Sequence, residues 1–335
     1  MTLRLVVTID TEPDNQWTMP APGLPAPPLA FANTRALPRV IDFLHDLGVP
    51  GTWLTSYSVA RDPDSARVLR SAAAGGDEIG GHLHAWETPP LTPADGQAHP
   101  YIYEYDPTVR LQKLRALTDA LRDVFGASPA SYRAGRWGID AAERENLASL
   151  GYTIDTSVVP GHDFGPSRGL TRGGPDFRAE LSGTPPRPRR VSGIWEAPVS
   201  VATLGLLGAA GSWGGGALGA RMAAAVSSRQ DLPSRACRRL LSSAGLSRMV
   251  WLRPLMHPRE DLVSAARDLA RRGAGFVNIM FHSSETMAGT SPRSRTHQDV
   301  ERFFEDMRAM VGALRAETAV EGCTLRRAIE TMDGS

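Results

Sequence analysis

Short runs of apolar residues alternate along the chain with longer segments in which apolar positions recur every three or four residues. Apolar runs of about four to eight residues between turn-forming residues are typical of buried strands, whereas the longer period is that of an amphipathic helix. The strand-like runs lie at residues 3–9, 51–57, 78–83, 130–133, 152–154, 194–199, 249–252 and 276–281. The helical pattern covers residues 35–47, 64–74, 107–125, 141–150, 259–271, 298–316 and 325–331. This alternation predicts an α/β protein built from βα units around parallel strands.

Four long segments rich in proline or glycine interrupt the alternation, at residues 13–28, 88–106, 161–190 and 200–220. Long loops inside a compact domain are usually functional or disordered. In a βα barrel, the loops at the carboxyl ends of the strands build the active site, and plain surface insertions are the alternative. Because 335 residues can fold around one core, we expect a single domain over residues 1–335.

The segment at residues 197–220 carries no charged side chain and is long enough to cross a bilayer. Seven of its residues are glycine, so its apolarity is weak and a spanning helix is disfavoured. We expect either a flexible lid over the site or a buried packing segment. Contact between such a lid and a membrane is the less favoured alternative.

Composition excludes some classes of partner. The chain is 22% charged with a net charge of +1, which argues against a nucleic acid or a strongly acidic polymer as partner. Cys237 and Cys323 lie far apart and fit neither a zinc cluster nor a disulfide framework. The apolar run that opens the chain is too short for a signal peptide, so we expect a cytoplasmic location.

The first strand-like run ends in two acidic residues, Asp10 and Glu12. Because side chains alternate along a strand, both carboxylates lie on the same side of the chain. Adjacent carboxylates repel each other unless a cation lies between them or one is protonated. With a cation, one carboxylate can be a ligand and the other a base. A solvated acidic turn or a glycosyltransferase metal motif would show the same pattern.

The run at residues 78–83 contains His82 near its end and is followed by His84, and these two residues also share one side of the chain. Two histidine nitrogens, a carboxylate oxygen and an open position for water form a usual catalytic zinc site. One histidine here would more often be a packed polar residue. Two histidines at this spacing, after a Gly-Gly pair, favour a metal site.

Two further strand-like runs end in residues suited to catalysis. Arg133 ends the run at 130–133, and an arginine can hold a carboxylate in a fixed orientation through paired hydrogen bonds. His282 follows the apolar run at 276–281, a suitable place for a general acid or base. An exposed basic turn is the alternative for the arginine.

These four strand-end motifs, in this order, resemble the polysaccharide deacetylase superfamily, also called carbohydrate esterase family four. The resemblance extends from Leu3 to about Thr331. It implies a distorted (β/α) barrel with about seven parallel strands and one divalent metal ion, usually Zn²⁺. It also implies hydrolysis of an N-acetyl group on an amino sugar.

The resemblance assigns roles to matching residues. It implies Asp10 as catalytic base, Arg133 as the arginine that orients it, and His282 as the general acid that protonates the leaving amine. The implied metal ligands are Glu12, His82 and His84. The implied substrate contacts are Trp86, Arg136, Trp137, Asp155 and Trp195, with support of His282 as a second role for Asp155.

The chain departs from the family pattern at two positions. Many members carry two adjacent aspartates in the first motif, where this chain has Thr11 after Asp10. The second histidine usually follows the first by four residues, which here is the position of Trp86. His84 is therefore assigned as the second ligand. Both departures bear on the identity and affinity of the metal.

Two other functions fit the same fold. A metal-independent amidase is one, although the pair of histidines argues against it. A catalytically inactive carbohydrate-binding protein is the other, although the retention of Asp10, Arg133 and His282 together argues against a dead site. The expected substrate is an N-acetylated sugar or glycoconjugate, such as a nucleotide sugar, a lipid-linked glycan, a polysaccharide or a glycosylated natural product.

Overall fold

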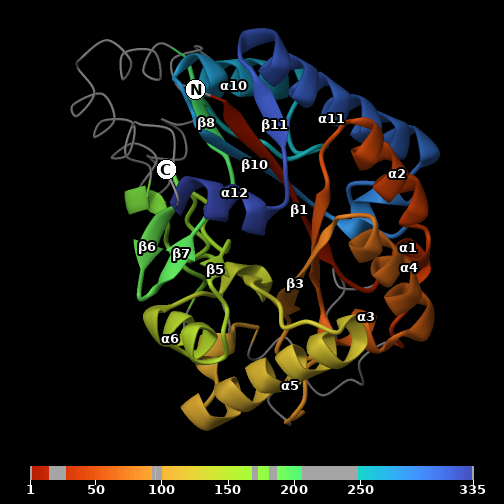
Figure 1. Ribbon diagram of the computed structural model, residues 1–335, viewed down its shortest axis with the longest axis vertical. Helices are drawn as coiled ribbons and strands as arrows, with labels where there is room; N and C mark the ends of the chain where they lie inside the picture. The colour runs from red at the N-terminus through yellow and green to blue at the C-terminus, as the bar shows by residue number, and fades with distance from the viewer. Residues whose placement is uncertain are drawn as a thin grey trace.

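A curled, mostly parallel sheet surrounded by helices forms the centre of the computed structural model (Figure 1). The structure describes residues 2–14, 28–92, 95, 100–167, 173–180, 187–205 and 248–333. Seven strands run parallel in the order β10, β1, β2, β3, β4, β5 and β7. Their bounds are β1 Leu3–Thr11, β2 Gly51–Thr55, β3 Glu78–Leu83, β4 Ser131–Ala134, β5 Ile154–Asp155, β7 Ile194–Glu196 and β10 Phe276–His282. The expected distorted (β/α) barrel with about seven parallel strands is confirmed.

Four more strands complete the described part of the sheet structure. They are β6 Arg189–Val191, antiparallel to β7 at the edge, β11 Val320–Gly322, parallel to β1, and the antiparallel pair β8 Val201–Leu204 and β9 Arg248–Trp251. The segment after β7 closes the gap to β10, because Ser200 N donates to Asn278 O at 3.0 Å. Leu252, just after β9, links the two segments: its N donates to Ser200 O at 2.9 Å, and its O accepts from Met280 N at 3.4 Å.

The helices cover the outside of the curled sheet (Figure 1). They are α1 Ala32–Arg35, α2 Pro38–Asp46, α3 Tyr57–Arg61, α4 Pro63–Ala74, α5 Pro107–Phe125, α6 Ala141–Ser149, α10 Arg259–Arg271, α11 His297–Glu317 and α12 Leu325–Asp333. Short 3₁₀ turns lie at Ile102–Glu104, Gly135–Trp137, Arg178–Glu180 and Ser283–Thr286. The bounds of α5 follow from its flanks: Asp106 accepts from Thr108 N, and Gly126 ends the helix with a φ of 77°.

The two ends of the barrel differ in role. Helix α12 covers the amino-terminal ends of the strands, where Leu325 N donates to Thr52 Oγ1 at 2.9 Å and Arg326 N to Glu78 Oε2 at 2.8 Å. Leu325, Ala328 and Ile329 of this helix belong to a buried cluster that also contains residues of β1, β5 and β10. The opposite, carboxyl-terminal ends of the strands are left for the polar residues of the site.

Several elements differ from the expected pattern. The helix expected at 35–47 begins later, at Pro38 as α2, and Arg35 is instead the last residue of α1; Pro38 has no N–H to continue a helix but is favoured at the start of one. The strand expected at 249–252 pairs with β8 outside the parallel sheet. Of the uncharged segment at 197–220, residues 197–202 are buried, whereas residues 206–220 lie outside the described residues. In the described part of the chain, no helix combines the length and apolarity needed to cross a membrane.

Candidate active site

A pocket of about 270 Å³ opens at the carboxyl ends of the parallel strands. Its polar floor comes from the ends of β1, β3 and β10, which supply Asp10, Glu12, His82, His84 and His282. Strand β1 is buried almost throughout, so the pleat that directs its apolar side chains into the core also carries the two carboxylates to the pocket.

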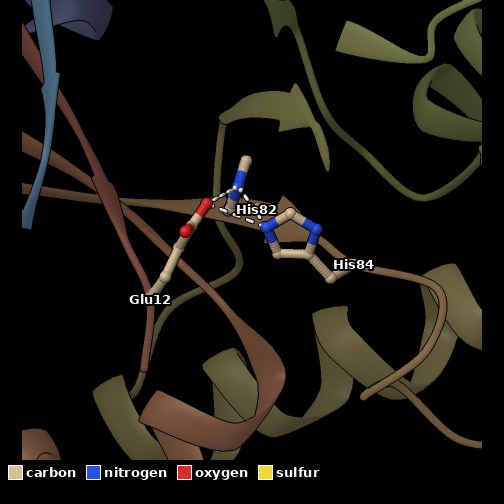
Figure 2. Close-up of side chains that lie close together, drawn as sticks. All are labelled: Glu12, His82 and His84. Atoms are coloured by element: carbon tan, nitrogen blue, oxygen red, sulfur yellow. Dashed lines mark hydrogen bonds and ion pairs between the residues drawn. The ribbon is translucent and has the colours of Figure 1, made fainter. Parts of the chain in front are cut away.

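Three of these side chains converge on one point (Figure 2). Glu12 Oε1 lies 2.8 Å from the Nε2 atoms of both His82 and His84, and the two Nε2 atoms are 3.1 Å apart. All three residues are at most 5% exposed, so water does not screen them from one another. The group is a candidate metal site made of two imidazole nitrogens and one carboxylate oxygen.

The hydrogen bond on the far side of His82 tests whether a cation fits this group. Its Nδ1 lies 3.0 Å from Arg133 O, and a carbonyl can only accept, so Nδ1 carries the proton. Nε2 of the neutral ring then presents its lone pair to the Glu12 carboxylate. Burial lowers the pKa of His82, but the carboxylates of Asp10 and Glu12 outweigh burial and raise it. The two carboxylates therefore favour a positive charge at this point, and a divalent cation would supply it.

Glycine at position 135 leaves room for His84. A Cβ on Gly135 would lie 2.5 Å from His84 Nδ1 and 2.5 Å from Leu83 O, well inside van der Waals contact. The ring of Trp86 packs against His84 from another side, with ring centroids 4.3 Å apart. The His84 imidazole is therefore held between the backbone of Gly135 and the indole of Trp86.

A buried lysine fixes the loop that follows these histidines. The ammonium of Lys113, in α5, donates to the carbonyl oxygens of Ala85, Thr88 and Pro90 at 2.8, 2.9 and 2.7 Å. Its side chain is fully buried, and its ion pair with Asp95 spans 3.3 Å. Three carbonyls converging on one charge hold the loop in a single conformation.

Asp10 is held as an anion by Arg133. Arg133 Nη1 lies 2.5 Å from Asp10 Oδ1, and both side chains are buried. Burial alone would raise the pKa of Asp10, but the Arg133 guanidinium, with His82 and His282, outweighs burial and holds the pKa below its usual value. Arg133 is itself fixed by Thr8 Oγ1 at 2.8 Å and by Thr156 O at 2.9 Å. A fixed, charged carboxylate at the pocket floor is suited to accept a proton.

His282 points one ring nitrogen at the floor and the other away from it. Nε2 lies 3.6 Å from Asp10 Oδ2, and Nδ1 lies 2.8 Å from Arg253 Nη2. An arginine can only donate, so Nδ1 accepts and Nε2 carries the ring proton. Glu285 fixes both partners: it accepts from Arg253 Nη2 at 2.6 Å and from His282 N at 3.0 Å. Burial would raise the pKa of Glu285, but Arg253 and His282 together outweigh burial and lower the pKa to about 2.

The residues predicted to contact substrate divide into two groups. Trp86, Arg136 and Trp137 line the pocket. Arg136 and Trp137 have left-handed φ angles of 54° and 64°, a conformation that costs a non-glycine residue on the order of 1 kcal/mol and is found at functional sites. Their side chains reach the pocket because the backbone turns sharply after β4.

The structure does not bring Asp155 or Trp195 to the pocket. Asp155 Oδ2 is paired with Arg144 Nε at 3.1 Å, and its Oδ1 accepts from Ser157 N at 2.9 Å. Trp195 packs against the cluster under α12, with the Arg190 guanidinium 4.7 Å from its ring centroid. Asp155 was expected to support His282, but His282 is supported by Arg253 and Glu285 instead. Strands β5 and β7 are only two and three residues long, so alternation along them could not place these side chains.

Other pocket residues were not predicted. Trp251 lies near the end of the strand expected at 249–252 and Arg253 directly follows it, so a strand-end position was the signal that could have identified them. Tyr101 and Phe164 come from the long segments at 88–106 and 161–190 and carry no periodic signal. Together with Trp86 and Trp137 they give the pocket an aromatic wall, which is the usual surface for one face of a sugar ring.

No protein-family model and no curated protein matches the sequence. Among solved structures, the chain is similar to a Mycobacterium smegmatis protein assigned as a polysaccharide deacetylase, with a TM-score of 0.56 and 17% identity over 99% of this chain and 91% of that one. The fold is that of the polysaccharide deacetylases. The chain is also similar to the 4-α-glucanotransferase of Thermococcus litoralis, with a TM-score of 0.51 and 11% identity over 98% of this chain and 40% of that one. Because the polysaccharide deacetylase fold is shared with a glucanotransferase, the reaction must be argued from the site.

Proposed function

We propose that the protein is a metal-dependent hydrolase that removes an N-acetyl group from an amino sugar or a glycoconjugate. The observation that carries this proposal is the convergence of Glu12, His82 and His84 on one point beside a separately held carboxylate, Asp10. Glycosidases use two carboxylates that flank a glycosidic bond. Here one carboxylate faces two imidazoles and the other faces an arginine, an arrangement suited to metal-assisted hydrolysis.

Glu12, His82 and His84 would hold the ion, and Zn²⁺ is the metal that two imidazoles and a carboxylate suit best. When bound, such an ion polarises a carbonyl and acidifies water. The aromatic wall would stack on the sugar ring and exclude bulk water from the acetamido group.

The protein's own residues then move the protons. Asp10, held charged by Arg133, takes a proton from the attacking water. The proton that Asp10 takes goes on to the departing nitrogen, which leaves as the amine. Asp10 lies 3.6 Å from His282 Nε2, so the Nε2–H of the neutral ring can donate a hydrogen bond to the reacting group beside Asp10 and hold it in place for this transfer. Arg253 holds Nδ1 and keeps Nε2–H directed at the reacting atoms.

A metal analysis of purified variants tests the proposal. We expect one equivalent of zinc in the wild-type protein and none in His82→Ala, with loss of acetate release from N-acetylglucosamine and its oligomers. His297→Ala is the matched control, because His297 is exposed at the start of α11 and does not line the pocket. Full occupancy in His82→Ala, or equal loss in His297→Ala, would contradict the assignment of the ligands.

A further inference from the structure

Three arginine side chains line the pocket, Arg136, Arg253 and Arg293, and of these the proposed reaction uses only Arg253, through its hydrogen bond to His282. Two of them share one buried carboxylate, because Glu285 Oε1 lies 2.6 Å from Arg253 Nη2 and 3.4 Å from Arg293 Nε. Arg136 forms no ion pair with any residue that the structure describes, and its guanidinium lies 5.7 Å from the centroid of the Tyr101 ring. The pocket wall therefore has an excess of positive charge.

The carboxylates on the pocket floor do not balance this charge. Asp10 is already paired with Arg133, and Glu12 faces the two histidines. Arg253 is only 4% exposed, and its Nε has no hydrogen-bond partner in the described part of the chain. A buried guanidinium without full compensation is costly, so an anionic ligand would be favoured there.

Arg293 is the arginine best placed to meet such a ligand. Its side chain is 33% exposed, and its guanidinium makes no hydrogen bond to a described residue. The arginine fork can bind a carboxylate or a phosphate through two parallel hydrogen bonds. Arg253, which contacts the same Glu285, adds a fixed charge beside it.

We infer that the amino sugar carries an oxyanion, a carboxylate or a phosphate, which binds at Arg253 and Arg293. This inference rests on the proposed function for its choice of a sugar. The position of His282 supports it, because Nε2 faces Asp10 while Nδ1 faces Arg253. The imidazole therefore separates the reacting end of the pocket from the anion-binding end, so one sugar can place its acetamido group at the first and its acidic group at the second.

Calorimetry on the zinc-loaded protein tests the inference without requiring turnover. The ligands are N-acetylglucosamine, its 1-phosphate and 6-phosphate, and N-acetylmuramic acid, at fixed ionic strength. We expect at least one acidic sugar to bind about tenfold or more tightly than the neutral sugar, the size expected of a charge-assisted pair. Arg293→Gln should remove this gain and leave neutral-sugar affinity unchanged.

Arg295→Gln is the matched control, because Arg295 is exposed, lies two residues away and does not line the pocket. The inference is overturned if no acidic sugar binds more tightly than N-acetylglucosamine, or if the gain survives in Arg293→Gln. The ligand panel also separates a phosphate from a carboxylate. Acetate release from neutral sugars without tighter binding of acidic sugars would contradict the inference and support the proposed function. Tighter binding of acidic sugars without acetate release would support the inference and contradict the proposed function.

Discussion

Removing the Arg133 side chain should expose how strongly the fold depends on the pair that holds Asp10. Both side chains are buried, and Arg133 also donates to Thr8 and Thr156. Arg133→Met keeps the bulk but leaves the carboxylate buried without its partner. Breaking a buried ion pair in this way costs about 3–5 kcal/mol of unfolding free energy. We expect a loss of that size at pH 7 in chemical denaturation.

The loss should also depend on pH, with a definite sign. In the wild-type protein the pKa of Asp10 is lowered, so its stabilisation is complete above the ordinary aspartate pKa and is lost as pH falls through the lower folded value. Without Arg133, burial dominates and raises that pKa. The folded state then binds the proton more tightly than the unfolded state, and stability falls as pH rises. Arg133→Met should therefore be closer to wild type at pH 5 than at pH 7.

Two further variants make the test decisive. Adding Asp10→Asn to Arg133→Met removes the buried charge and should recover much of the lost stability. Arg67→Met is the control, because Arg67 pairs with Asp64 at the surface and its loss should leave stability unchanged within error. The reasoning fails if Arg133→Met costs no more than Arg67→Met, or if its stability does not change between pH 5 and pH 7.

Three other predictions concern single substitutions. Asp10→Asn should retain zinc by metal analysis and lower kcat about a hundredfold or more, and near-normal turnover would refute its role as base. Gly135→Ala should weaken zinc binding about tenfold or more by displacing His84, whereas Gly312→Ala, with nothing within 4 Å of its new Cβ, should leave zinc binding unchanged. Lys113→Met should lower the unfolding free energy by about 3 kcal/mol, because three loop carbonyls lose their donor; an unchanged melting curve would contradict this.

The parts of the site that could be predicted from the sequence are those at the ends of regular strands. Asp10 lies near the end of a long buried strand and Glu12 directly follows it, and alternation places His82 and His84 on one side of the chain. These four residues and His282 lie together in the structure as their patterns indicated. Their chemical roles stay predictions, as does the cytoplasmic location, because no contact in the molecule tests them.

The rest depends on contacts between distant segments. The segment at 187–205 forms only short strands. Strands β6 and β7, at the edge of the sheet, are three residues long each, too short for alternation to predict that Trp195 packs under α12. Arg253 is oriented by Glu285, 32 residues away, and no local pattern links them. Tyr101 and Phe164 reach the pocket from irregular loops, whose conformation follows from the surrounding structure and not from periodicity.

The most direct test of the central claim is acetate release from N-acetylated amino sugars before and after removal of metal. The panel should contain neutral and acidic sugars, so that a strict acidic preference is not mistaken for inactivity. We predict that a chelator abolishes acetate release and that one equivalent of Zn²⁺ restores it. Full activity after chelation, or no acetate from any sugar in the panel with zinc bound, would contradict the account.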